Sequence, residues 1–107
     1  MSMNVYTHLI VGQKINRDMM PESALNMMDD GEEITEGEYK LCWFVDDEYH
    51  DNPIFGVSLA EADPYSDAPN VVIDDDALAE AKSVVSKHVK KLGFKPDVKL
   101  MMIGFWW

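Results

Sequence analysis

A chain of 107 residues with 47% hydrophobic and 10% aromatic residues is long enough for one folded domain and too apolar for a disordered chain. Its 20 acidic and 9 basic residues give a formal net charge of -11, and a surface of that charge repels nucleic acid and anionic membranes. We therefore expect a single acidic domain over residues 1–107, with no direct binding to nucleic acid or membranes.

Cysteine content and hydropathy indicate the compartment. The single cysteine, Cys42, excludes an internal disulfide, and it lies in the apolar run Leu41–Val45, where a thiol behaves as a small hydrophobic side chain. The first residues lack the basic and apolar segments of a secretion signal, and the longest apolar run, Leu100–Trp107, is too short to span a bilayer. We expect a cytoplasmic protein.

Two elements are predicted before residue 30. Residues 3–12 carry apolar and β-branched side chains in the two-residue period of a strand. Residues 21–28 begin with Pro21, which suits the first position of a helix, and continue with Ala, Leu and Met. The sequence therefore predicts a strand followed by a short helix.

The middle of the chain predicts a hairpin. Residues 38–46 and 54–59 are rich in aromatic and β-branched side chains, which favours strands. The segment Asp46–Pro53 between them is acidic and contains Asn and Pro, which are typical of turns. We expect two strands joined by a long polar turn.

The clearest element is a helix over residues 75–92. Apolar residues from Leu78 to Leu92 recur at the three- and four-residue spacing of one helix face. The three aspartates at 74–76 suit the positive N-terminal end, and Gly93 suits the left-handed residue that follows the last turn.

The last segment, Asp97–Trp107, predicts a strand whose two faces are both apolar beyond Leu100. Such a strand is typically central in its sheet or covered on both sides, so we expect it to lie in the core or in a subunit contact. Phe105, Trp106 and Trp107 are expected to pack within the chain or, as the alternative, in a homodimer interface.

Together these elements predict the α+β class. The expected order is strand, short helix, strand, strand, long helix, strand, which gives a four-stranded, mainly antiparallel sheet. A ferredoxin-like βαββαβ arrangement fits that order best.

Charge along the chain suggests where a partner binds. Residues 18–80 carry 19 of the 20 acids and one base, Lys40, whereas residues 81–107 carry six lysines and one acid. Solvation of acidic loops is the simplest explanation of such a run, and binding to a basic protein surface is the functional alternative. Dense acids without neighbouring bases are the candidate partner-binding residues: Glu32, Glu33, Glu36, Glu38, Asp46, Asp47, Glu48 and Asp51.

No motif indicates catalysis, a metal site or a cofactor. His50 lies among the acids of 46–51, but the spacing of a calcium loop is absent, and a solvated turn explains the segment better. His8 on the first strand and His88 on the long helix are expected to be structural. We assign no catalytic residue, metal ligand or cofactor.

The first functional hypothesis is a non-enzymatic protein-binding module, an inhibitor or accessory protein of phage or bacterial type that acts through its acidic face. A mimic of the nucleic-acid backbone that blocks a DNA- or RNA-binding protein is a sharper alternative. A metal-dependent enzyme or sensor that uses the 46–51 turn is a second alternative.

Overall fold

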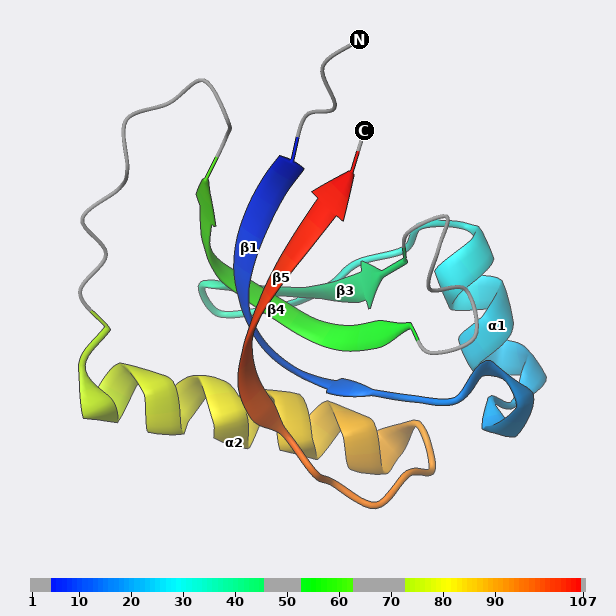
Figure 1. Ribbon diagram of the computed structural model, residues 1–107. Helices are drawn as coiled ribbons and strands as arrows, with labels where there is room; N and C mark the ends of the chain where they lie inside the picture. The colour runs from blue at the N-terminus through cyan, green and yellow to red at the C-terminus, as the bar shows by residue number, and fades with distance from the viewer. Residues whose placement is uncertain (1–4, 46–52, 63–72, 107) are drawn as a thin grey trace, which may run out of the picture.

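The fold is described by a computed structural model for residues 5–45, 53–62 and 73–106 (Figure 1). It contains five strands, two α-helices and a single 3-10 turn in that part of the chain. In chain order the elements are β1 (Val5–Lys14), the 3-10 helix η1 (Arg17–Met19), α1 (Glu22–Asp29), β2 (Ile34–Glu36), β3 (Tyr39–Phe44), β4 (Ile54–Ala62), α2 (Asp75–Lys91) and β5 (Lys99–Trp106). None of the described helices is long and apolar enough to cross a bilayer.

The strands form one sheet in the order β2-β3-β4-β1-β5, and all neighbouring strands are antiparallel. The α+β class is therefore confirmed, and so is the pairing of β3 with β4. The predicted count of four strands is wrong, because β2 adds a fifth. The ferredoxin-like order stays a prediction for the four strands other than β2.

Strand β2 was not predicted from the sequence, because it is only three residues long and ends in an acidic residue. It pairs with β3 through a tight turn in which Glu36 lies opposite Tyr39. Gly37 begins this turn with φ +60°, a conformation that glycine adopts without a steric penalty.

Helix α2 confirms the predicted long helix and its ends. The Asp74 side chain caps its start by accepting a hydrogen bond of 2.8 Å from the Ala77 N–H. At its end Gly93 has φ +97°, and the Phe94 N–H donates back to the Val89 carbonyl, which is the Schellman pattern. The short helix is also confirmed, with Pro21 as the residue before its first turn.

The main core lies between the sheet and the helices. Val11, Phe55 and Leu41 of the sheet are fully buried in one cluster with Ala81, Val85 and Val89 of α2, and α1 contributes Ala24, Met27 and Met28. Ile10 and Ile54 form a smaller cluster with Phe44, Met101 and Ile103. Since Ile10 is next to Val11 on β1, this second cluster lies on the opposite face of the sheet.

The paired strands β1 and β4 approach each other closely at two facing glycines. Gly12 lies opposite Gly56, and a Cβ atom at Gly56 would overlap the Val11 carbonyl oxygen. The two backbones are therefore closer than any other residue type at this position permits.

Strand β5 corrects a prediction. Its two apolar faces predicted a central or fully covered strand, but β5 lies at the edge of the sheet. Within the described chain, Leu100 is 42% exposed and Met102 is 74% exposed. Helix α2 packs mainly on β1 and β4.

Candidate functional site

Four of the eight acidic residues predicted to bind a partner lie in the described part of the chain. Glu32 and Glu33 follow α1 and are exposed, as is Glu38 in the turn between β2 and β3. Glu36 ends β2 and is one-third exposed, at 33% of its side chain. The remaining candidates Asp46, Asp47, Glu48 and Asp51 lie outside the described residues, together with His50 and Trp107. Phe105 and Trp106 are the last two residues of β5.

An acidic hollow lies between the β2–β3 turn and the first half of α2. We define it by the six residues that line a space of about 360 Å³: Glu36, Gly37, Glu38, Tyr39, Glu80 and Val84. Three of these residues are carboxylates, and they come from segments more than 40 residues apart in the sequence. Val84 and the Tyr39 ring supply the apolar part of the lining.

The charge of the acidic hollow acts on Tyr39. Burial of the phenol raises its pKa above the ordinary value of 10.0, and the carboxylates of Glu80 and Glu38 raise it further. The hydroxyl therefore stays protonated at neutral pH and is available as a hydrogen-bond donor.

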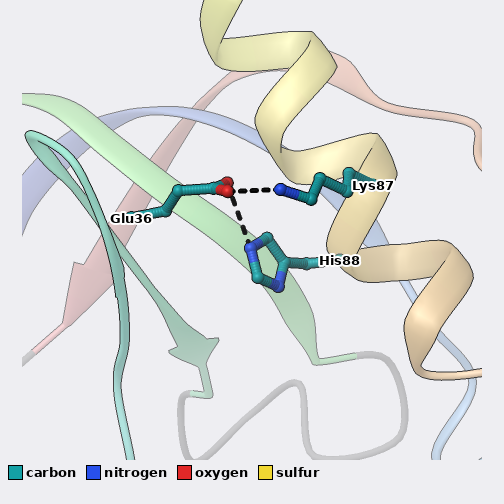
Figure 2. A network of polar contacts seen from close by, with 3 residues as sticks. All are labelled: Glu36, Lys87 and His88. Atoms are coloured by element: carbon teal, nitrogen blue, oxygen red, sulfur yellow. Dashed lines mark hydrogen bonds and ion pairs between the residues drawn. The ribbon is translucent and has the colours of Figure 1, made fainter.

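Glu36 is engaged within the chain (Figure 2). Its Oε1 accepts a hydrogen bond from the Lys87 ammonium, and its Oε2 lies 3.2 Å from His88 Nε2, which donates when it carries the proton. Both partners are on α2, and the His88 side chain is only 10% exposed. The hydrogen bond from Lys87 is the main cause that lowers the pKa of Glu36, and His88 adds to it against the opposing effect of burial.

This contact ties the short edge strand to the helix. Strand β2 has three residues, so its backbone pairing with β3 gives it few hydrogen bonds. Glu36 joins it to α2 across 51 and 52 residues of sequence. The carboxylate lines the acidic hollow and links β2 to α2 next to the turn that carries Gly37 and Glu38.

A second polar group lies on the sheet face opposite α2. His8 Nδ1 is 3.0 Å from Ser58 Oγ, and His8 Nε2 is 3.8 Å from Glu61 Oε1. The Ser58 hydroxyl also donates a hydrogen bond of 3.2 Å to the Ala60 carbonyl. The 3.8 Å between His8 Nε2 and Glu61 Oε1 is longer than a hydrogen bond. The geometry of this group fits a structural role on the sheet.

Cys42 and the clustering of potential metal ligands are the remaining features that bear on chemistry. Burial, with a smaller effect of Glu33, raises the pKa of the Cys42 thiol, which keeps it protonated and a poor nucleophile. Within residues 5–45, 53–62 and 73–106 no three His, Cys, Asp or Glu side chains come together as a metal site would require.

Comparison with known proteins adds no relative. No family model, no curated protein and no solved structure matches this chain.

Sequence reasoning selected Glu36 and Glu38 but missed Tyr39, Glu80 and Val84. Tyr39 reads in the sequence as an ordinary strand residue, and Glu80 as an exposed helix position. Neither residue has a local signal that links it to the other. The link is made by the packing of α2 across the sheet.

Proposed function

We propose that the protein is a non-enzymatic binding module that holds a lysine or arginine side chain of another protein in the acidic hollow. The observation that carries this proposal is the lining itself. Glu38 and Glu80 flank the hydroxyl-bearing Tyr39, and Val84 lies beside them.

The chemistry of the hollow favours a cation with an apolar stem. Long basic side chains place their methylene groups on apolar surface and their charge in a polar environment. Carboxylates accept charge-assisted hydrogen bonds from ammonium or guanidinium groups, and an aromatic ring adds a favourable interaction with a cation. Val84, Tyr39 and the carboxylates of Glu38 and Glu80, which form no ion pair with a described residue, supply these three contributions.

The negative charge of the rest of the chain would attract a basic partner over a distance. The net charge of -11 creates a negative field, and exposed Glu32 and Glu33 precede β2 directly. Such a field increases the rate of encounter with a basic surface, while contacts in the hollow set how long the complex lasts.

A titration with a capped Gly-Arg-Gly peptide tests the hollow without knowledge of the partner. We expect amide chemical-shift changes in the full chain to centre on Glu38, Tyr39 and Glu80, and a capped Gly-Gln-Gly peptide to cause none. The double variant E38Q/E80Q should weaken binding of the arginine peptide by about tenfold, since two exposed ion pairs of up to about 1 kcal/mol each are lost.

A matched double variant, E22Q/D30N at the two ends of α1, removes the same charge from exposed residues away from the hollow and should leave the arginine peptide bound. Equal weakening by both double variants would mean that net charge alone attracts the peptide. That result would reject the acidic hollow as a site and favour a mimic of the nucleic-acid backbone, whose binding falls steeply with salt.

A further inference from the structure

The outer edge of β5 is a second surface that the acidic hollow does not explain. Strand β5 pairs with β1 from Lys99 to Trp106, and the described part of the chain places no strand on its other side. An edge strand presents backbone N–H and C=O groups that pair readily with another strand.

Apolar side chains are concentrated on this edge. Three large hydrophobic residues are exposed in the described structure, Met19, Leu100 and Met102, and two of them are on β5. Leu100 and Met102 are two residues apart, so they lie on the same face of the strand. On the other face Met101 and Ile103 are partly buried against Ile10 and Ile54.

The opposite edge of the same sheet is protected. Strand β2 has three residues, ends with Glu36 and is preceded and followed by the exposed acids Glu33 and Glu38. Short length and charged side chains are the usual means by which proteins prevent edge pairing. Strand β5 has eight residues and one charge, Lys99, so it lacks both means.

We propose that β5 pairs with β5 of a second copy of this chain in antiparallel orientation and joins two sheets into one. Charge determines the choice of occupant. Each chain carries a net charge of -11, yet residues 98–107 contain one base and no acid. This edge therefore lets two copies meet without apposing carboxylates, and an apolar strand is complementary to itself across a two-fold axis.

The alternation of β5 side chains between the two faces of the sheet restricts the register in which two copies of β5 can pair. A two-fold axis perpendicular to the sheet keeps the faces aligned, so residues of the same face lie opposite one another. With the axis at Met102, the two Met102 side chains meet, and Leu100 lies beside Gly104 of the second copy, where the missing side chain leaves room. The two Lys99 residues are then about 20 Å apart along the joined strands.

The mass of the full chain in solution tests the proposal. By light scattering or sedimentation, we expect wild type to have twice the 12.2 kDa mass of one chain. The variants M102K and L100K should each be monomers, because they place a charge in the centre of the contact. M19K adds the same charge to a methionine that is 72% exposed elsewhere and should remain a dimer. Circular dichroism then confirms that each variant is folded.

Salt separates this contact from binding in the acidic hollow. Higher ionic strength should tighten the dimer, because it screens the repulsion between two acidic chains, whereas it should weaken binding of a basic side chain. A monomeric wild type, or dimers unaffected by both M102K and L100K, would overturn the proposal. A monomeric chain that captures a foreign protein through β5, with capture lost in M102K, would also overturn it and assign the edge to that partner.

Discussion

The two outer strands of the sheet differ in how they are stabilised. Strand β2 has three residues, and a buried histidine and a lysine of α2 hold its terminal Glu36. Strand β5 has eight residues, pairs with β1 along its whole length and leaves Leu100 and Met102 exposed. A polar side-chain contact to α2 thus adds to the short backbone pairing of the first edge, whereas the second edge has a longer backbone pairing and the packing of Met101 and Ile103 on Ile10 and Ile54. The difference suggests that β2 is built to present a site and β5 to accept another strand.

The close approach of β1 and β4 at Gly12 and Gly56 lies in the middle of the sheet. A substitution there should therefore have the largest effect on the free energy of unfolding. G56A places a Cβ atom against the Val11 carbonyl, and we expect a loss of about 3 kcal/mol or more of unfolding free energy. Urea denaturation measures the loss. G31A is the control, because Gly31 has φ +66° but open space around it, and it should cost about 1 kcal/mol. Equal costs for the two variants would contradict the close approach.

Glu36 should stabilise the β2 edge in a pH-dependent way. Its folded pKa lies below the ordinary value of 4.5, so the stability contributed by its ionised form is present above that value and is lost as pH falls through the lowered pKa. E36Q should therefore lower the urea midpoint at pH 7 and have little effect at the acid end of this range. E38Q, in the adjacent exposed turn, should change neither midpoint. If E36Q lowers the urea midpoint by the same amount at every pH, the charge of Glu36 does not contribute to stability.

Gln13 should stabilise the segment Lys95–Asp97, which leads into β5. Its amide donates to the Lys95 carbonyl at 3.0 Å, and its Oε1 accepts from the Asp97 N–H at 2.6 Å, on either side of Pro96. Q13A should cost about 1 kcal/mol in urea denaturation, because two partly exposed hydrogen bonds are lost. Q13E keeps the acceptor and loses the donor, so its cost should be smaller than that of Q13A. If Q13E costs as much as Q13A, the contact to Asp97 contributes nothing.

The smallest effect on folding should separate the two edges most clearly. M102T removes an exposed side chain, so the unfolding free energy of the monomer should change by less than about 0.5 kcal/mol. Hydrogen exchange of wild type should nevertheless show protection of β5 amides that rises with protein concentration, and M102T should reduce that rise. Amides of β2 should show no dependence on concentration. A β5 exchange rate that is constant over all concentrations would contradict pairing at this edge.

The sequence by itself determined the elements whose signals are local. Helix α2 was predicted with its N-terminal aspartates and Gly93 because capping and face spacing depend on neighbouring residues. The antiparallel pairing of β3 with β4 followed from two apolar strands around one polar turn. The α1 helix followed from Pro21 and the residues after it.

Only the tertiary structure decided the order of the strands and the content of the candidate site. Alternation of side chains along β5 reports apolar faces but not the number of neighbouring strands, so its edge position could not be read from residues 97–107. Glu36 contacts His88, and Tyr39 and Glu80 line one hollow, because α2 packs on β1 and β4. Contacts between residues that are 40 or more positions apart depend on how separate elements pack, and no local pattern encodes that packing.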